Sequence, residues 1–397
     1  MTPQPNPKTP HPDDRTASVA DHTAHFAENR ANWDDRAAFH EASGYGIAEL
    51  LASPDAITQE VSQDAGRLGD LAGLDVIHLQ CHLGLDTVSL SRLGAARVVG
   101  LDISPESLRR ARSLAARAGA DVELVEANVY DARTAVAGSF DLVYTTLGVL
   151  CWLPDIEAWA RVVASLLRPG GRLLLRDDHP AFMAVGDDVA HGLTLHEPYF
   201  QQAEPMTWED DGSYVAVPDG TPPIARTRNH QWNHAVGEIL TAVLRAGLVL
   251  DEVAETRVSA WCRWPDLMEP CEGGYRFADP AMREVLPLQL LVAAHRPAAG
   301  SSAGDSPSAD SLAGGSTASP STAGSPSADS LAGGSTASPS TAGSPSGGSI
   351  DGSPSGGSID GSPSGGSIDG SPAGGSPADG SAGPSADGPA GRAREVG

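Results

Sequence analysis

The sequence predicts an α/β domain built on a mainly parallel sheet with helices on both faces. From about residue 75 to residue 297, short apolar runs alternate with segments whose apolar residues recur at helical spacing. Strands that alternate with helices form parallel sheets, because each helix carries the chain back across the sheet. The length of this part of the chain also suits one large domain.

Seven short apolar runs are interpreted as strands, and four segments with helical periodicity as helices. In the helix after the second strand, Ser104 is a suitable N-cap, Pro105 fits the first turn and Gly119 ends the helix. The expected strands cover residues 76–80, 98–101, 122–125, 140–145, 173–175, 249–253 and 288–294. The other helices are expected at 86–93, at 156–167 with Pro169-Gly170-Gly171 as its end, and at 236–244.

Two segments lie outside this alternation. Residues 21–70 are mostly helical in pattern and polar, so they either cap a sheet edge or cover the crevice where ligands bind. Residues 180–230 are rich in Pro, Glu and Asp with scattered aromatic residues, and they interrupt the pattern after the fifth strand. Both segments are candidate substrate lids. Residues 1–20, with five Pro, are expected to be disordered.

Residues 298–397 form a low-complexity tail. They contain tandem repeats of 19 residues, from Ser306, and of nine residues, from Ser344. Each repeat holds a single Leu or Ile, so it buries too little apolar surface to offset the entropy of ordering. The tail is therefore expected to be disordered, either as a flexible solubilising linker or as expanded repeat DNA without a selected role.

The composition argues against several functions. The net charge is −25, of which −7 lies in the tail, so the remaining residues carry about −18 and lack the basic surface that nucleic acids require. No apolar run reaches 18 residues and the N-terminus has no signal-peptide character, which predicts a protein outside the membrane. The unpaired spacing of the cysteines indicates reduced thiols in a cytoplasmic protein, without disulfides or a zinc site: Cys81, Cys151, Cys262 and Cys271.

Three successive strands are followed by residues suited to bind a nucleoside. The first ends in HLQCHLGLDT, where Gly84 is all that is present of the GxGxxG pattern for dinucleotides. Asp102, after the second strand, can accept both hydroxyl protons of a ribose, or it is a turn or helix-cap acid. Asn128, after the third, can bond an adenine edge, or it is a turn residue. The order and spacing of these residues on neighbouring strand ends favour the binding role.

These motifs resemble those of class I S-adenosylmethionine-dependent methyltransferases that act on small molecules. The resemblance covers about residues 21–297, and its most recognisable stretch is LLRPGGRLLLRD, residues 166–177. FDLVYTTLGVLCWLPD, residues 140–155, is similar to the fourth-strand motif. The resemblance implies a Rossmann-like sheet of seven strands with the last one antiparallel, and an insertion at 180–230. It also implies S-adenosyl-L-methionine as methyl donor and S-adenosyl-L-homocysteine as product.

The resemblance further implies which residues contact the cofactor. The family's first loop, hhDhGxGxG, corresponds to VIHLQCHLG, in which His78 replaces the acid and Gln80 and His82 replace two glycines. Loss of glycine removes easy access to positive φ, but the two side chains offer hydrogen bonds to the cofactor. LQCHxGxDT is similar to the variant motif of a subgroup of bacterial methyltransferases. The expected cofactor residues are Tyr45, Gln80, Cys81, His82, Gly84, Asp102, Ile103, Asn128, Val129 and Leu147.

Methyl transfer from a sulfonium depends mainly on positioning, and it needs no metal. A group with a pKa near neutrality helps an oxygen or nitrogen nucleophile lose its proton. His179, after the fifth strand, is the first candidate base or orienting group, with Asp177 and Asp178 expected to hold its ring; a structural histidine is the alternative. His234 is the second candidate, next to a similar His230. Some aromatic residues line an apolar pocket or pack in the core: Trp33, Tyr45 and Trp152.

The leading prediction is methyl transfer from S-adenosylmethionine to an O, N or C nucleophile of a small molecule. Two other functions stay open. A nicotinamide-dependent oxidoreductase can be built on the same sheet, although the missing GxGxxG argues against it. A non-catalytic domain that binds a ligand or partner is supported only by the altered first loop.

Deletion of residues 298–397 should leave the melting temperature and the cofactor affinity nearly unchanged, because the tail has almost no apolar residues to contribute to a core. Thermal unfolding and calorimetry of the full-length and shortened chains test this. A drop of many degrees would show that the tail docks on the rest of the protein.

Overall fold

The computed structural model describes residues 19–298, apart from 191, 210–214, 216 and 222. The expectations of disorder in the first residues and in the tail fall largely outside the described residues. All described residues belong to one unit of the chain, residues 1–314. Within the described part, no helix is both long enough and apolar enough to cross a lipid bilayer.

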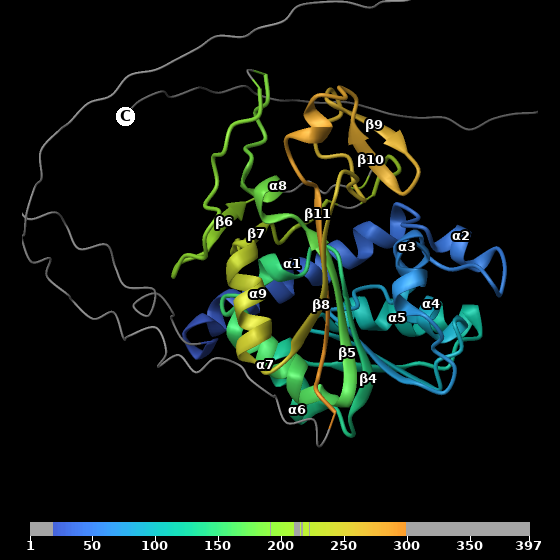
Figure 1. Cartoon of the computed structure of the whole chain (residues 1–397). Coiled ribbons are helices and arrows are strands. Elements are labelled where there is room, and N and C mark those ends of the chain that lie inside the picture. The colour runs from blue at the N-terminus through green and yellow to red at the C-terminus, as the bar shows by residue number, and fades with distance from the viewer. Residues whose placement is uncertain (1–18, 191, 210–214, 216, 222, 299–397) are drawn as a thin grey trace, which may run out of the picture. The chain divides into compact units, whose positions relative to one another are not determined.

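The fold is organised around a seven-stranded sheet of order β3-β2-β1-β4-β5-β11-β8. β11 is antiparallel to both of its neighbours, and the other neighbouring pairs are parallel. This confirms the predicted fold class, including the antiparallel last strand (Figure 1). The strands are β1 (Asp75–Leu79), β2 (Arg97–Asp102), β3 (Glu123–Glu126), β4 (Phe140–Thr146), β5 (Leu167–Asp178), β8 (Val249–Thr256) and β11 (Gln289–His295).

Helices cover both faces of the sheet (Figure 1). Alternate residues along the strands point to opposite faces, so Ile77 and Leu79 pack in one apolar cluster and Val76 in another. The first cluster includes residues of α6 (Ala132–Ala135), α7 (Ile156–Leu166) and α9 (Val236–Arg245). On the other face lie α3 (Gln59–Leu68), α4 (Leu85–Arg92) and α5 (Pro105–Ala118). The chain reverses its direction of winding between β1 and β4, which is where a ligand crevice is expected.

The helix at 105–118 forms as its sequence predicts. The Ser104 hydroxyl accepts the Ser107 N–H, Pro105 occupies the first turn, and Gly119 is left-handed at the C-cap. The fifth strand differs from the prediction, because β5 is far longer than 173–175 and includes the Pro-Gly-Gly stretch. A Cβ on Gly171 would lie 2.8 Å from the Phe140 carbonyl oxygen, so this glycine permits close packing of β5 against β4.

The three α-helices before the sheet lie against different parts of it. α1 (Thr23–Ala42) lies across the carboxyl ends of the strands: Asp34 accepts the Ser104 hydroxyl at 2.7 Å, and Asn29 exchanges two hydrogen bonds with the His230 backbone. α2 (Ile47–Leu51) follows it, and α3 packs on the sheet face. α1 thus lies at the strand ends and α3 on a sheet face, and a covering role for residues 21–70 stays a prediction.

Two insertions rise above the carboxyl ends of the strands (Figure 1). The predicted one at 180–230 holds α8 (Pro180–Ala184) and the paired strands β6 (Met206–Glu209) and β7 (Arg228–Gln231). The second, between β8 and β11, was missed by the sequence analysis and contains β9 (Met268–Cys271) and β10 (Gly274–Phe277). Its side chains share an apolar cluster with α8, which includes Phe182, Trp264, Met268, Phe277 and Leu288.

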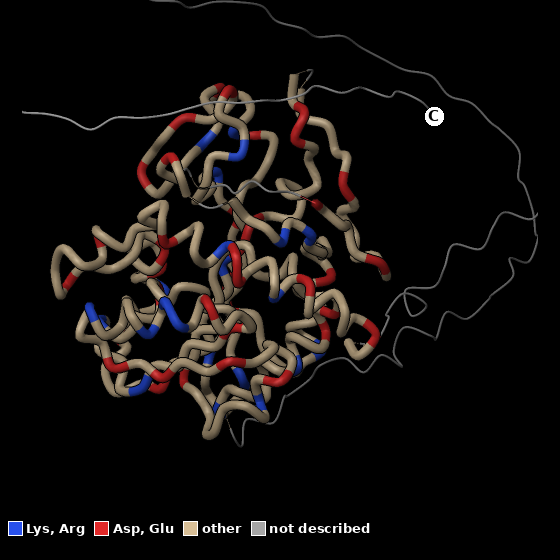
Figure 2. The backbone as a smooth tube through the Cα atoms, turned by 180° about the vertical axis from the view of Figure 1, so that it is seen from behind, with Lys and Arg blue, Asp and Glu red and all other residues tan. Residues whose placement is uncertain are grey.

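The charged residues are mixed along the chain. Figure 2 shows Arg interspersed with Asp and Glu over the described part of the chain, although α5 holds four Arg against one Glu. Arg110, for example, pairs with Glu41 and Glu106.

Candidate active site

The turn between β1 and α4 keeps a glycine-like backbone without the glycines. Gln80 and His82 have φ of 56° and 48°, which is the left-handed region. Gly84 has φ of 76° and begins α4, and a Cβ there would come within 3.0 Å of the Ala111 side chain. The replacement of two glycines predicts the loss of easy access to positive φ, but both residues adopt a positive φ.

Hydrogen bonds hold this turn in place. The Gln80 side-chain N–H donates to the Val149 carbonyl at 3.0 Å, and the His82 backbone N–H donates to Asp102 at 2.8 Å. The His82 ring lies 3.1 Å from the Ser107 hydroxyl and 2.9 Å from the His40 ring. A left-handed residue other than glycine costs about 1–2 kcal/mol, which contacts of this kind offset.

Strained backbone is concentrated around this turn. Among the described residues, positive φ outside glycine occurs at four positions: Tyr45, Gln80, His82 and Leu147. All four are predicted cofactor residues. The Tyr45 ring stacks on His40 and meets the edge of His82, and Leu147 directly follows β4. Such strain persists where the surrounding structure imposes it, and it clusters at ligand sites.

Asp102 links the ends of the first two strands. One carboxylate oxygen accepts the His82 N–H and the other accepts the Ser104 N–H, both at 2.8 Å. Burial is the largest effect on this group and raises its pKa to about 6. The carboxylate thus serves as a turn acid, which was the alternative drawn from the sequence. Two oxygens with about four lone-pair directions still have capacity for ligand hydroxyls.

The other cofactor candidates are less uniform. The side-chain Oδ1 of Asn128 caps a short turn by accepting the Tyr130 N–H at 3.1 Å, and this side chain also borders an open groove with Phe26. Val129 packs in the core, and Ile103 is half-buried. Cys81 is buried, which raises the pKa of its thiol, and all four cysteines are free.

A second buried carboxylate organises the loop after β4. Asp177 accepts the backbone N–H groups of Val149 at 3.2 Å and Leu150 at 2.8 Å, and that of Gly148 as well. This fixes the loop that begins at Leu147 and places it beside the end of β5. Trp33 of α1 touches both loops, because the centroid of its ring lies 5.0 Å from that of His82 and 5.3 Å from that of Trp152. Trp33 and Trp152 therefore pack against each other, and Tyr45 joins them through His82.

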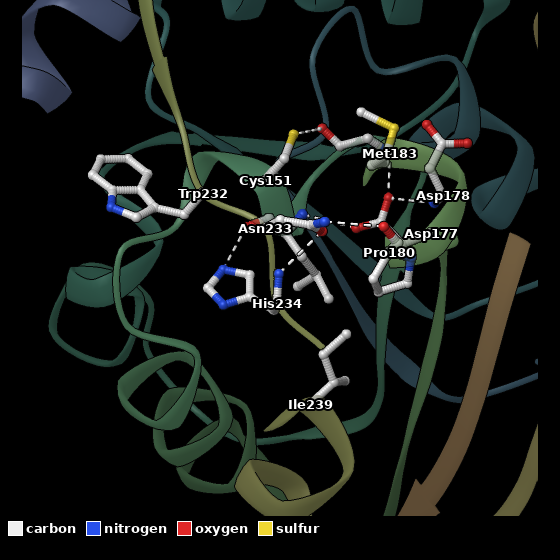
Figure 3. Close-up of a pocket in the computed structure, with 11 residues that line it drawn as sticks. Cys151, Asp177, Asp178, Pro180, Met183, Trp232, Asn233, His234 and Ile239 are labelled. Atoms are coloured by element: carbon white, nitrogen blue, oxygen red, sulfur yellow. Dashed lines mark hydrogen bonds between the residues drawn. The ribbon is translucent and has the colours of Figure 1, made fainter. Parts of the chain in front are cut away.

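A small pocket lies at the ends of β4 and β5. In Figure 3, Asp177, Asp178 and Pro180 lie on one side of it and Trp232 on the other. Oδ1 of Asp178 is buried without a hydrogen-bond partner, while Oδ2 accepts the Trp261 indole N–H at 3.1 Å. Burial, and then the Asp177 charge, raise the pKa of Asp178 to about 7. From the sequence, Asp178 is expected only to hold the His179 ring. The signal for a place in the pocket is a carboxylate at a strand end beside an insertion.

His179 is not held as the sequence predicted. Its Nδ1 accepts the Ala181 N–H at 3.0 Å and caps α8, and its Nε2 donates to Glu255 at 2.8 Å. Asp177 and Asp178 were expected to hold the ring, but Asp177 bonds the β4 loop and Asp178 bonds Trp261. Burial lowers the pKa of His179. Both ring nitrogens are thus engaged by contacts within the protein.

His234 and His230 are also held by the protein. His234 Nε2 donates to the carbonyls of Leu150 and Leu153, and burial lowers its pKa to about 4. It lines the pocket of Figure 3, and through these two carbonyl groups it also holds the loop after β4. His230 bonds Glu28 of α1. No group of three or more His, Cys, Asp or Glu in the described part of the chain is arranged to hold a metal ion.

Comparisons with known proteins agree with this geometry. A family described as a methyltransferase domain matches residues 76–171. A ubiquinone biosynthesis O-methyltransferase of Escherichia coli O157:H7 is 35% identical over 163 residues, which cover 38% of this chain and 67% of that protein. The enzyme of the same name from Xanthomonas euvesicatoria is 40% identical over 106 residues, 27% of this chain and 44% of its own length. The chain thus spans less than half of this latter relative.

A solved structure with a similar fold is a S-adenosylmethionine dependent methyltransferase from Mesorhizobium loti. It is 23% identical, the match covers 60% of this chain and 98% of that one, and the TM-score is 0.38. The strand order, the turn after β1 and the sequence relatives together define a class: the chain belongs to the class I S-adenosylmethionine-dependent methyltransferases.

Gln80→Gly should be more stable than Gln80→Ala by about 1 kcal/mol, because only glycine is free of the steric cost at φ 56°. Both variants lose the bond to Val149, so their difference isolates the backbone term. Chemical denaturation gives the two free energies of unfolding. If the free energy of unfolding were higher for Gln80→Ala than for Gln80→Gly, residue 80 would not be left-handed.

Asp178→Asn should raise the free energy of unfolding at pH 8 by about 1–3 kcal/mol, and less at pH 5. The folded pKa of about 7 lies above the unfolded value, so stability is full at low pH and is lost as the pH rises through 7. Denaturation at the two pH values measures this, with the exposed Asp121→Asn as control. If Asp178→Asn changed the free energy of unfolding equally at pH 5 and pH 8, Asp178 would not be a desolvated carboxylate.

Proposed function

We propose that this protein transfers the methyl group of S-adenosylmethionine to an O, N or C nucleophile of a small molecule. The cofactor would lie over the ends of β1, β2 and β3, and the acceptor over the ends of β4 and β5. The observation that carries this proposal is the left-handed turn at Gln80 and His82, tied through Asp102 to the end of β2. S-adenosylmethionine has no phosphate, so a turn without the GxGxxG pattern can accept it.

The residues at the turn fit such a ligand. Oε1 of Gln80 is buried and has no hydrogen-bond partner in the described structure, so it offers an acceptor for a donor group of the cofactor. Asp102 keeps acceptor capacity for two ribose hydroxyls, and Asn128 lies one strand further along. When bound, the cofactor supplies a methyl group on a sulfonium that is already activated for in-line displacement.

The protein's own part is to position the acceptor and to exclude water. α1 and the two insertions cover the crevice, and Trp33 and Trp152 close its apolar side. Asp178 is the best-placed group to take a hydrogen bond from an acceptor hydroxyl or amine, because its Oδ1 is unpartnered and the pocket adjoins it. His179 and His234 stay predictions as catalytic groups; their contacts support positioning roles.

The relatives favour an oxygen acceptor, since those named above are O-methyltransferases. The family match ends at residue 171, before the pocket residues Asp177 and Asp178 begin, so it bears on the cofactor half of the site. We further propose a cytoplasmic location with reduced thiols and no role for nucleic acid, in line with the acidic composition.

Calorimetry of the full chain with S-adenosylhomocysteine and with NAD⁺ tests the cofactor. We expect micromolar-range binding of S-adenosylhomocysteine and none of NAD⁺. The reverse result would reject the proposal in favour of an oxidoreductase. Transfer of a labelled methyl group to a metabolite extract would then show whether the protein is an enzyme.

Asp102→Asn should weaken S-adenosylhomocysteine binding by about 1.5–3 kcal/mol, the scale of charge-assisted hydrogen bonds. Calorimetry on the folded variant measures the loss, with Asp121→Asn as the exposed control. Unchanged affinity would show that Asp102 does not bind the ligand and only holds the turn after β1.

A further inference from the structure

The end of β1 carries no negative charge in this protein. His78 stands where the family has an acid, and it is buried between two hydroxyls: Thr87 Oγ1 lies 2.9 Å from Nδ1 and Thr146 Oγ1 lies 3.2 Å from Nε2. Burial lowers the pKa of His78 to about 4, so the ring is neutral at pH 7. A cationic ligand at this place would have to find its counter-charge elsewhere.

A carboxylate reaches the same point from the neighbouring helix. Asp86 is the second residue of α4, two positions after Gly84, and its Oδ2 accepts the Thr146 hydroxyl at 2.8 Å. Thr146 has one proton, which it gives to Asp86, so it must accept from the Nε2–H of His78. Nδ1 of His78 then accepts the Thr87 hydroxyl. The hydrogen bonds thus run in one direction, from Thr87 through His78 and Thr146 to Asp86, and they orient Asp86 against the end of β4.

Asp86 forms no ion pair with an Arg or His of the described residues. Oδ1 of Asp86 accepts no hydrogen bond from any described residue. Glu60, in the first turn of α3, is close enough for Asp86 to help raise its pKa to about 7, after the larger effect of burial. Arg176, the cation nearby, is bound on its Nε and Nη2 by the buried Asp64 and on Nη1 by Gln289. Among the described residues, neither Asp86 nor Glu60 is paired with a cation.

We propose that Asp86 binds the α-ammonium group of the cofactor's methionine part, in place of the acid absent at position 78. The inference rests on the proposed function. S-adenosylmethionine carries positive charge on its ammonium and on its sulfonium, and both belong to the end of the molecule opposite the adenine. Asp86 lies on the β1–β4 side of the turn, whereas Asp102 and Asn128 lie on the β2–β3 side, so the two ends of one ligand have separate partners.

Two ligands test the assignment on the full chain. S-adenosylhomocysteine carries the α-ammonium, and 5′-methylthioadenosine has the same nucleoside without the amino-acid part. Asp86→Asn keeps the shape and an acceptor for Thr146 but removes the charge, so it should weaken S-adenosylhomocysteine binding by about 10–100-fold and leave 5′-methylthioadenosine unchanged. Thr146→Val, which removes the orienting hydroxyl, should give a smaller loss with the same selectivity. Calorimetry measures both.

Glu106→Gln is the matched control. Glu106 is the second residue of α5, as Asp86 is of α4, but it is exposed and pairs with Arg109 and Arg110. This variant should bind both ligands like the wild type, which separates the proposed contact from the general effect of a first-turn acid on its helix. Thermal unfolding of each variant without ligand shows whether it is folded. If Asp86→Asn does not fold, Thr146→Val still tests the contact.

The outcomes distinguish this inference from the proposed function. If the wild type binds neither ligand, the methyltransferase proposal fails. If it binds S-adenosylhomocysteine and Asp86→Asn binds it equally well, the cofactor proposal stands and the role of Asp86 is rejected. Equal losses for both ligands would make Asp86 a structural residue of the turn and would also reject the contact with the ammonium group.

Discussion

The carboxylate of Asp102 is the interaction on which the cofactor half of the structure depends. It lies at the end of β2 and accepts a backbone N–H from His82 and another from Ser104. The first bond reaches the turn after β1, and the second fixes the start of α5. Because the turn is left-handed at two residues other than glycine, it needs such external anchors to remain in place.

Asp177 repeats this arrangement on the other half of the sheet. It lies at the end of β5 and accepts three successive N–H groups of the loop after β4. Gln80 then joins the two halves, since its side chain donates to the carbonyl of Val149 in that same loop. The crevice is therefore framed by two loops, each fixed by a buried carboxylate from the neighbouring strand.

These buried acids also set the electrostatics of the crevice. Burial raises the pKa of Asp102, Asp178 and Glu60, which shows that each ionised form is held at a cost. The histidines of the same region, including His78 and His82, are kept neutral by burial. A crevice with neutral imidazoles and several carboxylates complements a ligand with a cationic sulfonium and ammonium.

The sequence by itself determined the layered fold, because apolar period, caps and breakers act over a few residues: Ser104, Pro105 and Gly119 delimit α5 as predicted. It also indicated the strand ends where Asp102 and Asn128 lie. Only the tertiary structure decided what the side chains do there. His179 became the cap of α8 and a partner of Glu255, while Asp178 turned to the pocket and Trp261. The cap is a local contact, but Glu255 lies 76 residues from His179, and Trp261 lies 83 residues from Asp178 in an unforeseen insertion. No local pattern specifies contacts over such distances in the chain.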